Sequence, residues 1–168
     1  MKSEQRLGLL LRQQGWTLST AESCTGGRLA ARITAIPGAS AYFLGGIVAY
    51  DNQYKTRLLG VPLTTLEQYG AVSSETAQAM AEGGRRVFAS DLSVGITGIA
   101  GPSGGTADKP VGLVYIAIAG GGNTCATRFV FAGDRSAVQR QAVTSALDLL
   151  LSRLSVTDSK PPLPGHRP

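Results

Sequence analysis

Three side chains in the first third of the sequence have the types needed to cleave an acyl bond without a histidine. Ser40 follows a Pro37-Gly38 break, Tyr50 closes an apolar run, and Lys55 lies 15 residues after Ser40 and five after Tyr50. A serine whose proton is taken by a neutral lysine is a known nucleophile and base pair. The spacing is compatible with that chemistry, and equally with Lys55 as a solvated charge on a helix surface.

The position of the only histidine of the chain argues against several catalytic mechanisms. His166 lies in the C-terminal segment 157–168, which is rich in proline, lacks aromatic residues and is expected to be disordered. A Ser-His-Asp triad, a Cys-His pair or a histidine-based metal site needs an imidazole that the fold holds in place. We therefore expect a lysine, tyrosine or carboxylate base and no histidine-based metal site. We also expect no cofactor.

The two cysteines, Cys24 and Cys125, are too few for a disulfide framework and lack the spaced partners of a structural zinc site. This usage predicts a reducing, cytoplasmic setting. Cys24 lies at a predicted helix start, where a thiolate is favoured, so it remains open as the nucleophile of a different hydrolase.

Composition indicates one globular domain over residues 1–156. The chain has 168 residues, of which 43% are hydrophobic and 16% charged, enough for one sizeable core. Its net charge of +5 is mild, and the basic residues form no stripe interleaved with aromatics, which argues against nucleic acid as a partner. No apolar run reaches the length of a membrane span.

Apolar periodicity and breaker residues predict alternating helices and strands. We expect helices over residues 3–14, 28–36, 55–59, 65–69, 73 or 74 to 88, and 134–154, and strands over 17–20, 43–50, 91–97, 110–119 and 124–131, with a hairpin at 120–123. This order predicts a three-layer α/β/α single domain around a mixed sheet.

In such sheets, ligands bind beyond the carboxyl ends of the strands. The first candidate loop, "TAESCTGG", leads from a strand into a helix, where free backbone N–H groups can form an anion site from Ser23, Thr25, Gly26 and Gly27. The alternative is that Ser23 or Thr25 only caps the helix and that the glycines only form the turn.

The second candidate loop lies in "GITGIAGPSGGTADKPVG", residues 95–112, where glycines would let the backbone approach a ligand closely. Its candidate ligand-binding residues are Thr97, Gly98, Gly101, Gly104, Gly105, Thr106 and Lys109. The alternative is a solvated surface loop.

Four separated motifs, "TAESCTGG", "AYDNQYK" with the preceding "GASAYF", "GAVSSETA" and the glycine-rich loop, occur in an order that resembles the C-terminal domain of the competence-damage protein CinA. The resemblance covers about residues 5–155. This family also includes stand-alone nicotinamide-nucleotide amidases. The chain lacks the larger N-terminal domain of full-length CinA, so we expect it to act alone or as a homo-oligomer, with a dimer favoured.

The resemblance implies a metal-free amidohydrolase that converts nicotinamide mononucleotide to nicotinate mononucleotide and ammonia. It places the catalytic set on Ser40, Tyr50 and Lys55. Many relatives carry serine where this chain has Asp51, and a nearby carboxylate would raise the pKa of Lys55. We therefore expect Lys55 in a dry pocket with Asp51 turned outward. A non-catalytic nucleotide-binding domain remains the alternative.

Overall fold

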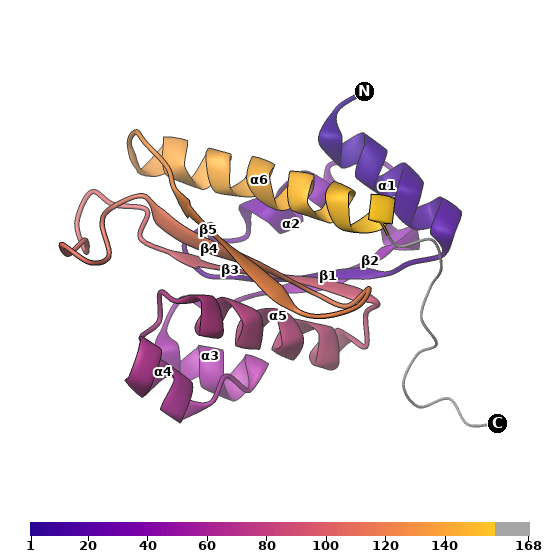
Figure 1. Ribbon diagram of the computed structural model, residues 1–168. Coiled ribbons are helices and arrows are strands. Elements are labelled where there is room, and N and C mark those ends of the chain that lie inside the picture. Colours follow the sequence, from indigo (N-terminus) through magenta and orange to yellow (C-terminus); the bar gives the residue numbers. More distant parts are fainter. Residues whose placement is uncertain (157–168) are drawn as a thin grey trace.

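Five apolar segments pair into one mixed sheet in the computed structural model, which describes residues 1–156 (Figure 1). The strands are β1 (Leu18–Glu22), β2 (Phe43–Val48), β3 (Leu92–Gly98), β4 (Leu113–Ala119) and β5 (Cys125–Val130), in the spatial order β2-β1-β3-β4-β5. β1 is parallel to β2 and β3, whereas β4 is antiparallel to β3 and β5. β1, β2, β3 and β5 therefore all end at the same edge of the sheet.

Helices cover both faces of the sheet, which confirms the predicted three-layer α/β/α architecture (Figure 1). One layer holds α1 (Ser3–Gln14), α2 (Arg28–Thr34) and α6 (Arg135–Val156), and the other holds α3 (Asn52–Leu59), α4 (Leu63–Tyr69) and α5 (Ser74–Phe88). A short 3-10 helix, η1 (Ala39–Ala41), precedes β2. Among residues 1–156, no helix combines the length and apolarity that a membrane span requires.

Helix ends follow the capping signals in the sequence. α1 stops before Gly15, which has a left-handed φ of 66°. The Asp51 carboxylate accepts the Gln53 N–H at 2.8 Å at the start of α3, and the Ser73 hydroxyl accepts the Thr76 N–H at 3.1 Å at the start of α5. Local chemistry sets these boundaries, and α1 and α5 agree closely with the sequence-based expectation. α3 begins at Asn52, three residues earlier than expected, because the Asp51 cap adds a turn before Lys55.

β1 lies later in the chain than expected, at Leu18–Glu22 instead of 17–20. Thr17 is held by the Asp91 carboxylate, which accepts both its N–H and its hydroxyl at 2.8 Å. At the other end, pairing with β2 and β3 continues to Glu22. This extension places the "ESC" segment directly at the edge where the neighbouring strands end.

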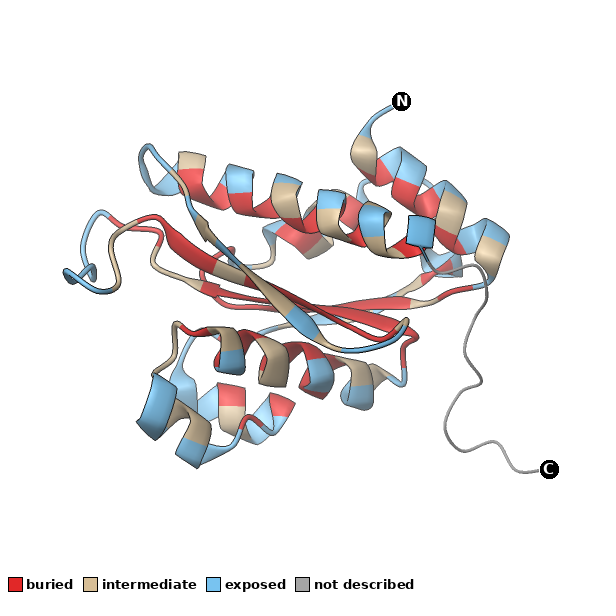
Figure 2. Cartoon of the chain, viewed as in Figure 1, coloured by how far each residue is buried: buried red, intermediate tan, exposed pale blue. Residues whose placement is uncertain are grey.

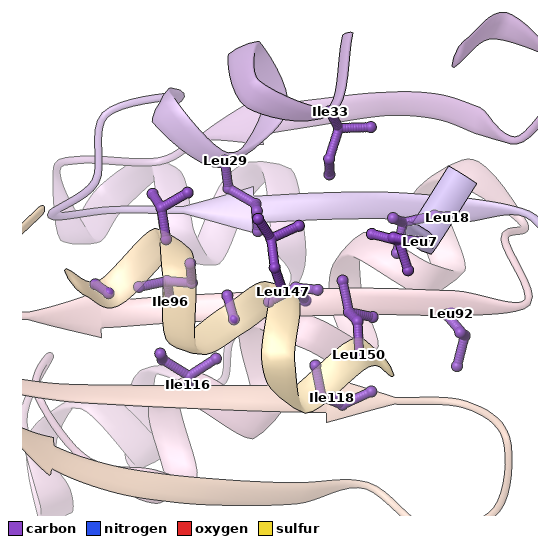
Figure 3. Packing of buried hydrophobic residues seen from close by; sticks show 14 of the residues in the cluster. Leu7, Leu18, Leu29, Ile33, Leu92, Ile96, Ile116, Ile118, Leu147 and Leu150 are labelled. Atoms are coloured by element: carbon purple, nitrogen blue, oxygen red, sulfur yellow. The ribbon is translucent and has the colours of Figure 1, made fainter. Parts of the chain in front are cut away.

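The two faces of the sheet are packed in different ways. Large aliphatic side chains fill the space between the sheet and α1, α2 and α6, including Leu18, Leu29, Ile96, Ile116 and Leu147 (Figure 3). Small residues line the other face, so α5 lies very close to β3, and a Cβ at Gly95 would collide with the Ala77 carbonyl oxygen. In both layers, the buried sides of the helices face the sheet (Figure 2).

The expected proline-rich tail, with His166, lies outside the described residues.

Candidate active site

A cavity of about 260 Å³ opens at the edge where the parallel strands end. Five segments line it: Ser23 and Cys24 after β1; Tyr50, Asn52 and Lys55 after β2; Ala71 and Val72 before α5; Thr97 to Gly101, Ser103 and Gly104 after β3; and Arg135 at the start of α6. A larger cavity of about 460 Å³, lined by Arg85 and Arg86 among others, holds none of the predicted site residues. The smaller cavity is therefore the candidate site.

Lys55 is buried in this site, with only 2% of its surface exposed. Its ammonium group donates to the Tyr50 carbonyl oxygen at 2.9 Å and to Asn52 Oδ1 at 3.4 Å. Burial lowers the pKa of Lys55, and the smaller opposing effects of Asp51 and Cys24 raise it. Asp51 is itself exposed, as expected. The fold thus favours the neutral amine that a general base requires.

Ser23 is the serine that shares the cavity with Lys55. Only 7% of its surface is exposed, and its N–H donates to the Ile96 carbonyl oxygen at 2.9 Å, which fixes it to the end of β3. Within residues 1–156, its hydroxyl and the N–H groups of Cys24 and Thr25 make no hydrogen bond. A free hydroxyl next to two free backbone donors is the arrangement that acyl transfer uses.

Cys24 lines the same cavity, but its thiol is unsuited to act as the nucleophile. Burial, with a smaller contribution from the Glu22 carboxylate, raises the pKa of the Cys24 thiol to about 12. The thiolate is the reactive form of cysteine. At neutral pH Cys24 therefore stays protonated, contrary to the expectation drawn from its place near a helix start.

Ser40 does not reach the cavity, which corrects the catalytic set implied by the resemblance. It lies in η1, before β2, whereas Tyr50 follows the opposite end of the same strand. An extended chain advances about 3.3 Å per residue, so the length of β2 alone separates the two residues by roughly 20 Å. The fold brings Tyr50 and Lys55 together in the cavity, whereas Ser40 lies outside it.

The start of α2 is already occupied by a carboxylate of the chain itself. Glu22 accepts the Thr25 hydroxyl at 2.6 Å and the backbone N–H groups of Gly27, Leu29 and Ala30 at 3.2, 3.1 and 2.9 Å. The expected anion cradle is therefore filled, and neither Ser23 nor Thr25 caps the helix. Thr25, Gly26 and Gly27 instead line a separate cavity of about 270 Å³.

The glycine-rich loop is divided between the cavity and solvent. Thr97, Gly98, Gly101 and Gly104 line the cavity, but Gly105, Thr106 and Lys109 do not. The Lys109 ammonium donates to the Tyr69 carbonyl oxygen at 2.7 Å, and the Thr106 hydroxyl accepts the Lys109 N–H at 3.0 Å. Lys109 thus holds the loop to the end of α4, and Thr106 is bonded to Lys109 within the loop.

Arg135 and Asn52 line the cavity but were not predicted from the sequence. Arg135 donates to the Tyr50 phenol oxygen at 2.6 Å and to the Gly101 carbonyl oxygen at 2.9 Å. The predicted hairpin made β5 antiparallel to β4. Because β4 is also antiparallel to β3, β5 ends at the same edge of the sheet as β3. The residues that follow β5 therefore had to begin beside the site.

Lys55 and Arg135 give the cavity two basic groups, and none of the described residues that line it carries a carboxylate. Residues 1–156 also contain no group of three or more His, Cys, Asp or Glu side chains placed to hold a metal ion. The geometry suits an anionic ligand next to a serine and a buried amine.

Comparisons with known proteins agree with this architecture. Residues 1–154 match the CinA C-terminal domain. A CinA-like protein of Citrifermentans bemidjiense is 52% identical over 158 residues, which are 94% of this chain and 38% of that protein. Another, of Geotalea uraniireducens, is 56% identical over 145 residues, or 86% and 34%. The chain thus spans little more than a third of the length of these relatives.

Solved structures show the same fold. A CinA superfamily protein from Klebsiella pneumoniae superposes with a TM-score of 0.87 at 35% identity, covering 92% of this chain and 99% of that one. A competence/damage inducible protein from Agrobacterium tumefaciens gives 0.84 at 38% identity, covering 91% and 96%. The chain therefore belongs to the CinA C-terminal domain family.

Proposed function

We propose that this domain is an amidohydrolase that converts nicotinamide mononucleotide to nicotinate mononucleotide and ammonia. The observation that carries the proposal is the placement of Ser23 and the buried Lys55 in one cavity that also holds Arg135 and that none of the carboxylates of residues 1–156 lines. The substrate follows from the family resemblance and from the charge of the site. A nucleoside monophosphate is anionic and carries a flat, amide-bearing ring.

In the proposed reaction, neutral Lys55 takes the proton of the Ser23 hydroxyl, and the oxygen attacks the carboxamide carbon. A neutral amine has two hydrogens and one lone pair. The Tyr50 carbonyl and Asn52 Oδ1 accept those two hydrogens, which leaves the lone pair for Ser23. Lys55 then returns the proton to the leaving nitrogen, which departs as ammonia.

The N–H groups of Cys24 and Thr25 are the proposed oxyanion donors, because they directly follow the nucleophile and make no hydrogen bond within the described part of the chain. Water then hydrolyses the acyl-enzyme. Arg135 is the proposed phosphate ligand, because a guanidinium binds a phosphate through two parallel hydrogen bonds. The phosphate would replace Tyr50 and Gly101 as its partners.

The test is ammonia release from nicotinamide mononucleotide, nicotinamide riboside, nicotinamide and NAD, measured side by side. We expect the mononucleotide to react far faster than the riboside or free nicotinamide, because only it offers a terminal phosphate. Equal rates on all three would contradict the phosphate site. Calorimetric binding of the mononucleotide without ammonia release would contradict the enzyme and favour a non-catalytic nucleotide-binding domain.

A further inference from the structure

The turn that carries Ser23 is held from two sides by buried side chains that do not line the cavity of the candidate active site. Glu22 precedes the turn, and Gln139 reaches it from α6, more than a hundred residues later in the chain. Their exposed fractions are 1% and 7%. Neither side chain is explained by substrate contact, so their role must be sought in what they hold.

Glu22 holds the turn from within. Its four hydrogen bonds come from one hydroxyl and three backbone N–H groups, and no ion pair to it occurs among residues 1–156. Burying a carboxylate without a paired cation is costly unless hydrogen bonds satisfy it. Here they do, and each of them joins the end of β1 to the turn or to the first residues of α2.

Gln139 holds the turn from outside. Its amide nitrogen donates to the Cys24 carbonyl oxygen at 2.8 Å, and its amide oxygen accepts from Arg28 Nε at 3.0 Å. Because Arg28 can only donate and a carbonyl can only accept, the orientation of the amide is fixed by its partners. One side chain thus joins α6, the turn and α2.

The contact on the Cys24 carbonyl has a geometric consequence for its neighbour. The carbonyl of Cys24 and the N–H of Thr25 belong to the same trans peptide plane and point in opposite directions. Fixing that carbonyl toward Gln139 therefore directs the Thr25 N–H away from α6. This is one of the two free donors beside Ser23.

We propose that Glu22 and Gln139 are positioning residues that set the direction of the Ser23 hydroxyl and of the Thr25 N–H. This inference rests on the proposed function, since it assigns the two side chains to the same acyl-transfer site. Neither residue touches the substrate. Both act through the backbone of the turn, so their loss affects the reacting geometry more than substrate affinity.

The test compares two isosteric changes on α6, Gln139→Glu and Gln141→Glu. The first keeps an acceptor for Arg28 but replaces the donor to the Cys24 carbonyl by an oxygen. The second, its matched control, changes an exposed amide whose hydrogen bonds within residues 1–156 go to the Ala132 and Ala137 carbonyls. Gln139→Met and Glu22→Gln serve as second variants should Gln139→Glu fail to fold.

We expect Gln139→Glu and Glu22→Gln to lower kcat on nicotinamide mononucleotide by about ten- to a hundredfold, the range for a small misplacement of reacting groups. KM should stay within about twofold, and Gln141→Glu should match the unchanged chain. A kcat that falls only in proportion to the folded fraction, or a KM that rises as kcat falls, would overturn the positioning role.

Amide hydrogen exchange of the peptide that spans Ser23–Gly27 separates this inference from the proposed function. If the unchanged chain releases no ammonia, the proposed function fails, and exchange alone decides the inference. Faster exchange in Gln139→Glu than in Gln141→Glu then supports a turn held by Gln139. Equal exchange in the two variants overturns it.

Discussion

The Arg135 guanidinium and the Tyr50 phenol oxygen are joined by a 2.6 Å hydrogen bond that connects the start of α6 to the chain after β2. Tyr50 is 59% exposed, and Arg135 is exposed as well. Both residues line the cavity, so this bond lies within the candidate site. An anion that enters the cavity can take over the Arg135 donors without disturbing the core.

Replacing Arg135 should therefore impair binding of a phosphorylated substrate selectively. We expect Arg135→Gln to raise KM for nicotinamide mononucleotide about tenfold or more, the effect of losing one charge-assisted hydrogen bond. Steady-state kinetics should show no such change for the riboside. Arg140→Gln is the matched control, because Arg140 is exposed one turn further along α6 and bonds to Ser136. Equal effects on both substrates would remove Arg135 from the phosphate site.

The two candidate serine nucleophiles, Ser23 and Ser40, can be separated by single substitutions. Ser23→Ala should reduce ammonia release by at least about a hundredfold, because the attacking oxygen is lost. Ser40→Ala should leave the rate near that of the unchanged chain, because Ser40 lies at the far end of β2. Mass spectrometry of a trapped acyl adduct locates the modified residue. An adduct on Ser40, or on Cys24, would refute the assignment to Ser23.

Activity should rise with pH along a limb set by Lys55, since burial lowers its pKa and only the neutral amine accepts a proton. Lys55→Arg keeps the positive charge but cannot lose a proton. We expect this variant to lose at least about a hundredfold in kcat while still binding the mononucleotide in calorimetry. Persistence of the same limb in a slow Lys55→Ala variant would assign it to another group.

The same pKa shift has a stability counterpart that serves as an independent control. Between the lowered pKa of folded Lys55 and the unfolded value of about 10.4, the unfolded chain binds more protons than the folded one. The free energy of unfolding of the unchanged chain should therefore increase with pH across this window, relative to Lys55→Met. Denaturant titrations at several pH values measure it. A constant difference would mean that the pKa is not shifted.

Lys109 should not contribute to substrate affinity, although it lies in the glycine-rich loop. Its ammonium is bonded to the Tyr69 carbonyl and does not line the cavity. We expect Lys109→Met to change KM for nicotinamide mononucleotide by less than about twofold, far below the effect of losing a charged ligand contact. A tenfold rise in KM would show that the loop turns this side chain toward the phosphate when substrate binds.

The close approach of α5 to the sheet predicts a steric defect at Gly95. A Cβ there would collide with the Ala77 carbonyl oxygen and lie 2.7 Å from the Ala81 nitrogen. We expect Gly95→Ala to lower the free energy of unfolding by about 3 kcal/mol, at the upper end for overpacking. For Gly15→Ala, no heavy atom of residues 1–156 apart from Gly15 and its chain neighbours lies within 4 Å of the added Cβ, so we expect a smaller loss of about 1 kcal/mol from the left-handed backbone. Urea titrations rank the two variants, and a smaller loss at Gly95 would contradict the packing argument.

Local chemistry made much of the fold predictable from sequence. Gly15 and Ser73 mark helix ends through interactions with residues only a few positions away, and the structure places those ends as expected. The start of β1 was less predictable, because Thr17 is held by Asp91, which is distant in sequence. Contacts of that range leave no periodic signal.

The candidate site was predicted in part. Lys55 and Tyr50 share a short motif and meet through one helix start, whereas Ser40 belongs to the same stretch of sequence but to the opposite end of β2. A motif read along the chain does not reveal that a strand separates its members. Likewise, a glycine-rich helix start suggested a vacant anion site, and only the structure shows that Glu22 reaches it.

The Glu22 contacts also affect how the affinity of this domain for a phosphorylated substrate should depend on ionic strength. Because Glu22 supplies a carboxylate to the start of α2, the phosphate of the proposed substrate would be recognised by the exposed Arg135 guanidinium. The field of such a group is screened over about 8 Å at physiological ionic strength, whereas buried charges are screened much less. The affinity for the proposed substrate should therefore decrease as the salt concentration rises. Single substitutions in the first turn of α6 can change that affinity while the turn that carries Ser23 stays unchanged.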